Sequence, residues 1–256
     1  MEKSQIYYHR AHRKTSFSWN RFLLEFMAFV PQCWVFILFC YPFVTQIAAQ
    51  YLIRWNPPLN PGTASIFKET TFLFGRIFTP ELAGKYPTPQ FSYAVFVAAL
   101  GGILLTLKIR IPKPVAVWVC FVSLIGMASS LFFIFLPSLF PYTIQQFAEI
   151  FVKTEIAVWL CIPIIMSFSL LPIPSTMLSK FAAIIFTLFY AMAFGLVRYV
   201  LFVTILVRFS YIFMAVLFFC FGPFIDFISV VGVYSFYVST VSKKINQDLR
   251  VWNWSY

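Results

Sequence analysis

Charged side chains and histidines are scarce in this 256-residue chain. Asp, Glu, Lys and Arg together make up 11% of the residues, against about 25% in soluble domains. Both histidines, His9 and His12, lie in the basic N-terminal segment, so no histidine is available in the apolar segments as a general base or haem ligand. This argues against haem-bearing cytochromes and against Ser-His or Cys-His hydrolases acting inside a bilayer.

Common enzyme and cofactor fingerprints are also missing. The sequence has no P-loop, no dinucleotide-binding glycine motif, no HExxH and no nucleophile elbow. The five cysteines lie in apolar runs without the paired spacings of zinc or redox motifs, so we expect free thiols, no metal and no cofactor. Whether the chain is an enzyme stays open here, although the missing motifs weigh against it. The cysteines are Cys33, Cys40, Cys120, Cys161 and Cys220.

Long apolar runs dominate what remains. The chain is 61% hydrophobic and contains 34 Phe, which is typical of an integral membrane protein. Six runs are long enough to cross about 30 Å of hydrocarbon. The sequence therefore predicts an all-α polytopic bundle of six transmembrane helices in a lipid bilayer. The runs lie near 22–50, 91–107, 114–137, 156–172, 181–207 and 211–240.

The basic residues indicate topology. The net charge is +11, but Lys and Arg gather at the ends of apolar runs and form no basic stripe, so a nucleic-acid partner is not expected. With the N-terminus inside, twelve Lys and Arg fall on the cytoplasmic side and six on the exterior side, which predicts that both termini are cytoplasmic. The expected parts are a basic segment 1–21, a bundle 22–240 with an exterior loop 51–90, and a tail 241–256.

Two exterior segments have helical character. Within the loop 51–90, the stretch SIFKETTFLFGRIF predicts a helix lying at the membrane interface, with Phe67, Phe74 and Phe78 toward lipid. It is either a lid over an exterior site or, as we favour, a connector resting on the bilayer. The stretch TIQQFAEIFVKTE predicts an amphipathic helix that does not span and leads into the fourth span.

Arg198 and Asp226 are the charges deepest inside apolar segments, where a charge is costly and usually functional. Helical rise places them about 15 Å and about 24 Å below the exterior turn. Gly222-Pro223 is expected to break the helix before Asp226. Three interpretations stay open: an arginine facing an exterior cavity, a buried Arg198–Asp226 pair, or a neutral Asp226 without a partner.

The patterns FGLVRYVLF and FIDFISVVGVYSF resemble the exosortase/archaeosortase family of membrane transpeptidases, which process proteins with a C-terminal sorting signal. The family carries a Cys at the exterior start of one helix, an Arg in an NxxR context on the next, and a His one helix later. Here the NxxR position corresponds to Gly195 to Arg198, which keeps the arginine and loses the asparagine. The cysteine would fall near Lys153 and Thr154 and the histidine near Asp226, and neither catalytic type is present.

The resemblance covers residues 150–240 and implies a catalytically degenerate member in the bacterial cytoplasmic membrane. Cys161 is the only nearby thiol, and its use as the nucleophile would shift the register. The candidate catalytic residues are thus Arg198, Asp226 and Cys161. Arg198, Lys153 and Arg208 are the candidates for binding a substrate.

Three functions stay open on the sequence. The first is an exosortase-like membrane protein without transpeptidase activity, acting as a binding or accessory subunit. The second is a transporter or channel-like subunit that uses Arg198 and Asp226. The third is a structural subunit of a larger membrane complex, which would account for the high Phe content.

Overall fold

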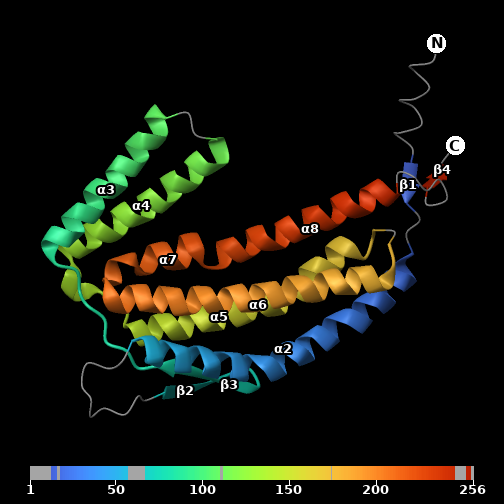
Figure 1. The fold of residues 1–256 in the computed structure, drawn as a ribbon, viewed down its shortest axis with the longest axis horizontal. Helices are drawn as coiled ribbons and strands as arrows, with labels where there is room; N and C mark the ends of the chain where they lie inside the picture. Colours follow the sequence, from blue (N-terminus) through green and yellow to red (C-terminus); the bar gives the residue numbers. More distant parts are fainter. Residues whose placement is uncertain are drawn as a thin grey trace. The chain divides into compact units, whose positions relative to one another are not determined.

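Helices make up nearly all of the structure (Figure 1). The computed structural model describes residues 13–15, 18–56, 67–109, 112–173, 175–245 and 252–254. Most of the basic segment 1–21, both histidines, the first proline-rich part of the exterior loop and half of the tail 241–256 lie outside these residues. The helices are α2 (Trp19–Trp55), α3 (Pro89–Lys108), α4 (Lys113–Phe135), α5 (Ile144–Leu170), α6 (Met177–Arg208), α7 (Met214–Phe221) and α8 (Pro223–Ile245), with 3-10 turns η1 (Pro137–Leu139) and η2 (Tyr211–Phe213). The strands are β1 (Arg13–Thr15), β2 (Phe67–Phe72), β3 (Gly75–Pro80) and β4 (Trp252–Trp254).

Six segments are long and apolar enough to cross a membrane, which confirms the predicted all-α polytopic bundle. Five are the single helices α2 to α6. The sixth, Tyr211–Lys243, is a compound span made of η2, α7 and α8. Strand β1 pairs antiparallel with β4, so segments close to the two ends of the chain lie side by side.

The chain divides into two compact units, each described by itself. Unit 1 contains the first part of α2, the second part of α5, the first part of α6 and nearly all of α8. Unit 2 contains the rest of α2, the strands β2 and β3, α3, α4, the first part of α5, the end of α6, η2, α7 and the start of α8. The ranges are 1–37, 159–192 and 228–256 for unit 1, and 38–158 and 193–227 for unit 2.

Aromatic and aliphatic side chains hold unit 1 together. The ring of Phe29 on α2 lies 5.1 Å from that of Phe181 on α6, measured between centroids. The indole of Trp34 donates to the carbonyl of Leu160 over 2.9 Å. Such ring pairs add about 0.5–1.5 kcal/mol beyond the apolar area they bury, so the helices of this unit pack as they would in any apolar core.

The fourth span is longer than the sequence predicted. The amphipathic segment is not separate, because α5 runs without a break from Ile144 to Leu170. Its first turn is closed by a reciprocal pair: the amide of Gln146 donates to the Thr143 hydroxyl over 3.2 Å, and the amide of Thr143 donates to the Gln146 side chain over 2.9 Å. Phe147 and Phe151 are buried and Ile150 is 43% exposed. The apolar face therefore packs on protein, and Ile150 is not part of it.

The predicted interfacial helix in the exterior loop is wrong, because β2 and β3 form an antiparallel hairpin there. The chain reverses at Leu73, which has a φ of 53°. Tyr41 donates from its hydroxyl to the carbonyl of Phe72 over 2.5 Å, which fixes the end of β2 against α2. Gly75 begins β3 where a Cβ would meet the Tyr41 hydroxyl. The β-branched and aromatic residues of this stretch suit strands, and the contact with Tyr41 selects them.

Candidate functional site

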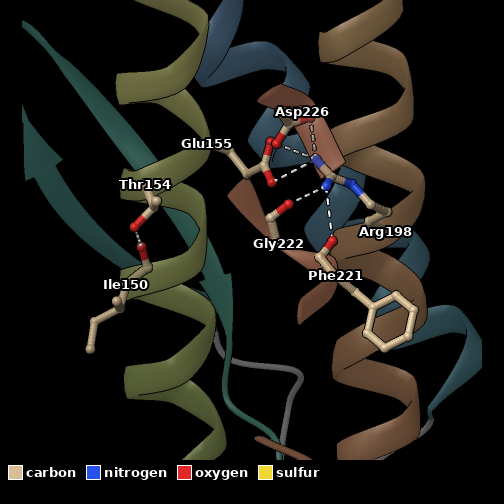
Figure 2. Close-up of polar contacts among 7 residues, drawn as sticks. All are labelled: Ile150, Thr154, Glu155, Arg198, Phe221, Gly222 and Asp226. Atoms are coloured by element: carbon tan, nitrogen blue, oxygen red, sulfur yellow. Dashed lines mark hydrogen bonds and ion pairs between the residues drawn. The ribbon is translucent and has the colours of Figure 1, made fainter. Parts of the chain in front are cut away.

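Arg198 lies at the centre of a buried charge cluster in unit 2 (Figure 2). Its Nη2 donates to both carboxylate oxygens of Asp226, each over 2.5 Å, and to Oε1 of Glu155 over 2.9 Å. Arg198 comes from α6, Glu155 from α5 and Asp226 from the first turn of α8. The three residues are 5%, 3% and 1% exposed. One guanidinium therefore joins three helices in a place that water does not reach.

The break between α7 and α8 completes this cluster. Pro223 has no N–H to continue the helix, and Gly222 has backbone angles of −80° and −125°. The amide of Ile225 bonds the carbonyl of Gly222 over 3.0 Å instead of that of Phe221. Arg198 Nη1 then donates to Phe221 O over 2.9 Å and to Gly222 O over 2.7 Å. The arginine thus satisfies the backbone acceptors at the break.

The structure brings together the two charges that the sequence singled out. Arg198 and Asp226 pair directly, although helical rise alone separates their depths by about 9 Å. The compound span removes the difference, because the chain is interrupted at Gly222 before Asp226. Of the three interpretations, the structure agrees with the buried pair of Arg198 and Asp226. It adds a second carboxylate, from Glu155.

Glu155 is the member of the cluster that the sequence analysis missed. It lies four residues after Phe151 and eight after Phe147, both buried, so it continues the inward-facing stripe of α5. A carboxylate at helical spacing from buried aromatic residues predicts a buried charge, so Glu155 could have been found from the sequence. It was overlooked because the segment was divided into an amphipathic helix and a separate span.

The remaining candidate residues have other partners. Lys153 binds Glu149 over 2.6 Å, one turn away on α5. Arg208 donates to the carbonyl of Trp55 over 3.3 Å. Cys161 is exposed and belongs to unit 1, whereas the cluster belongs to unit 2. Thr154, beside the cluster in sequence, turns its hydroxyl to its own helix, where it donates to Ile150 O over 2.8 Å (Figure 2).

Unit 1 contains a second buried ion pair. Lys180 on α6 donates to Glu25 on α2 over 3.2 Å and to the carbonyl of Leu171 over 2.8 Å. The side chains of Lys180 and Glu25 are each 3% exposed. Arg21 adds a second cation to Glu25 over 2.6 Å, from an exposed position. Lys180 is one of the twelve basic residues on the predicted cytoplasmic side, and nothing in the sequence marks it as buried.

A comparison with protein-family models, curated proteins and solved structures finds no match to this chain.

Proposed function

We propose that this chain is an exosortase-like integral membrane protein of the bacterial cytoplasmic membrane that lacks transpeptidase activity and acts as a binding or accessory subunit. The observation that carries the proposal is that the positions corresponding to the family's three catalytic residues lie close together. The resemblance placed the family's cysteine near Lys153 and Thr154, its arginine at Arg198 and its histidine near Asp226. Glu155, which follows Thr154, lies with Arg198 and Asp226 in one cluster.

The chemistry of this cluster supports a non-enzymatic role. Among the described residues, the side chains that form it are two carboxyl groups and a guanidinium (Figure 2). Cys220, on α7 just before the break, is fully buried, and Cys161 lies in the other unit. A transpeptidase needs a thiolate that the substrate can reach. The buried thiol of Cys220 does not meet this requirement.

An apolar cavity of about 230 Å³ in unit 2 supports a binding role. Its lining includes Phe147 and Ile150 of α5 and Met214 and Phe218 of α7. Ile150 lies five residues before Glu155 on α5, and Phe218 lies three before Phe221 on α7, so two of the helices that line the cavity also contribute to the cluster. Arg198 already donates to four acceptor groups, so an apolar segment of a client protein is the better ligand for this place.

Capture and cleavage are separate readouts for this proposal. The purified chain is incubated with a membrane-anchored client that carries a C-terminal sorting signal. We expect the client to co-purify uncleaved. The variant Ala215→Phe, which fills the cavity, should abolish capture. The matched control Ala98→Phe, on the exposed side of α3, should retain it.

Different results would contradict the two parts of the proposal, the absence of transpeptidase activity and the binding of a client. Cleavage of the client that Cys161→Ala abolishes would contradict the non-enzymatic half. Absence of capture by the folded wild-type chain would contradict the binding half.

A second candidate, a transporter or channel-like subunit, is favoured by the discontinuous sixth span. Broken helices beside buried charges are typical of the sites of secondary transporters. In this chain the break at Gly222 lies directly against Arg198. Flux of ions or anionic solutes into proteoliposomes would test it. Flux that Arg198→Leu and Asp226→Asn leave unchanged would remove its premise.

A further inference from the structure

We propose that the Glu155–Arg198–Asp226 cluster binds one proton, which is held between the carboxyl groups of Glu155 and Asp226. The proposal rests on the charges and contacts of the cluster and holds whether or not the chain binds a sorting signal. A hydronium ion of the solvent supplies the proton: one of its O–H bonds breaks, an O–H bond forms on the carboxylate of Glu155, and neutral water remains. Release of the proton to water is the reverse of this step.

Charge balance is the first argument. Two carboxylates face one guanidinium, so the fully ionised cluster carries one excess negative charge. An uncompensated charge in a buried site costs several kcal/mol. The elements around the cluster offer no second cation among the described residues. On α5, Lys153 binds Glu149; on α6, the next charge is Arg208, which donates to Trp55.

The helices that follow α6 add no positive charge near the cluster. α7 carries only apolar residues and the thiol of Cys220, and α8 carries no charge between Asp226 and Lys243. The nearest phenol in sequence, Tyr199, is buried with a hydroxyl that has no hydrogen-bond partner among the described residues. Among the described residues, none of these four helices supplies the missing positive charge.

An unused oxygen is the second argument. Glu155 Oε2 is buried and accepts no hydrogen bond from any described residue, while Glu155 Oε1 and both oxygens of Asp226 accept from Arg198. The carboxyl groups of Glu155 and Asp226 lie side by side, because both accept from the same nitrogen, Nη2 of Arg198, over 2.9 Å and 2.5 Å. Two carboxylates have no donor between them. A proton on Glu155 supplies that donor and removes both the excess charge and the unsatisfied oxygen.

Coordination distinguishes a proton from a metal cation. Hard cations such as Mg²⁺ and Ca²⁺ take about six or more oxygen ligands. Here Arg198 already occupies the carbonyls of Phe221 and Gly222 and three of the four carboxylate oxygens. The described residues contain no group of three or more His, Cys, Asp or Glu that could hold a metal ion. A single free oxygen is enough for a proton and too few for a metal.

Infrared spectroscopy of the purified full chain in lipid nanodiscs at pH 7 tests the proposal. We expect a C=O stretching band of a protonated carboxylic acid that shifts in D₂O. The band should be lost in Glu155→Gln and retained in Glu149→Gln, the control on the same helix. No band in the wild type would overturn the proposal, and so would a band that persists in Glu155→Gln.

Stability gives a second and independent readout. Gln at position 155 keeps an oxygen for Arg198 and supplies an N–H for Asp226, so it imitates the protonated acid. We expect Glu155→Gln to unfold within a few degrees of the wild type in K⁺, Na⁺ or choline buffer. Failure of this variant to fold while Glu149→Gln folds would contradict the proposal. So would a wild-type unfolding temperature that depends on Na⁺.

Discussion

Lys180 of α6 donates to Glu25 of α2 over 3.2 Å, and each side chain is 3% exposed. Lys180 depends more on Glu25 for charge compensation than Glu25 depends on Lys180. Glu25 has a second cation in Arg21, 67% exposed and 2.6 Å away, whereas the other acceptor of Lys180 is the neutral carbonyl of Leu171. Removal of Glu25 therefore leaves a buried charge with less compensation than removal of Lys180 does.

This asymmetry predicts unequal losses of stability. Glu25→Leu should lower the free energy of unfolding by about 3–5 kcal/mol, because it leaves a buried ammonium without a counter-ion. Lys180→Met should cost about 1–3 kcal/mol, because Arg21 still compensates Glu25. Chemical unfolding in a single detergent measures both. The double variant should be more stable than Glu25→Leu alone, and equal losses in the two single variants would contradict the argument.

Arg198→Gln should lower the free energy of unfolding by about 3–5 kcal/mol. The change removes the guanidinium that compensates the buried carboxylate of Asp226 and takes a donor from Glu155 and from the carbonyls at the helix break. The matched control is Arg76→Gln, in an exposed pair with Glu69, which should cost less than about 1 kcal/mol. Comparable losses in the two variants would show that the cluster adds no stability.

Gly222→Ala and Gly232→Ala should change stability in opposite directions. A Cβ at Gly222 would meet the backbone carbonyl of Phe218, which cannot move without distorting α7, so we expect a loss of about 1–3 kcal/mol. A Cβ at Gly232 meets nothing within 4 Å. Alanine there should stabilise α8 by about 0.5–1 kcal/mol. Thermal unfolding of both variants measures the difference, and a neutral Gly222→Ala would mean that the break does not need glycine.

Gly75→Ala should destabilise the hairpin of β2 and β3 by about 1–3 kcal/mol. The added methyl group would meet the hydroxyl and ring of Tyr41, which is fully buried and bonded to Phe72. Gly101→Ala on α3 is the control, because nothing lies within 4 Å of its Cβ position. Limited proteolysis reports on opening of the hairpin. Equal protease resistance of the two variants would contradict the proposed role of the contact with Tyr41.

The apolar runs were enough to predict the six spans, since a run of about 20 apolar residues has few alternatives to a membrane helix. The break was predictable from Gly222-Pro223, because proline removes a helical donor wherever it lies. The hairpin of β2 and β3 was missed although its β-branched and aromatic residues suit strands, because the contact that fixes the end of β2 comes from Tyr41 on α2. Local propensity carries no information about such a contact.

The site was predictable only in part, for the same reason. Arg198 and Asp226 stand out because each is a lone charge in an apolar run. Glu155 does not, because it lies near Glu149 and Lys153 in a segment that looks amphipathic. Lys180 looks like a surface cation at the end of a span, and only its contact with Glu25 shows that it is buried.

The position of Arg198 on α6 also has a consequence for biosynthesis. A helix break leaves backbone carbonyls without donors, which hydrocarbon cannot supply. The break at Gly222 is made after α5 and α6, so Glu155 and Arg198 are already joined to the nascent chain when the carbonyls of Phe221 and Gly222 leave the ribosome. Arg198 can therefore donate to the carbonyls of Phe221 and Gly222 as soon as the sixth span folds. The backbone acceptors at this break need no donor from a later helix for the span to enter the bilayer.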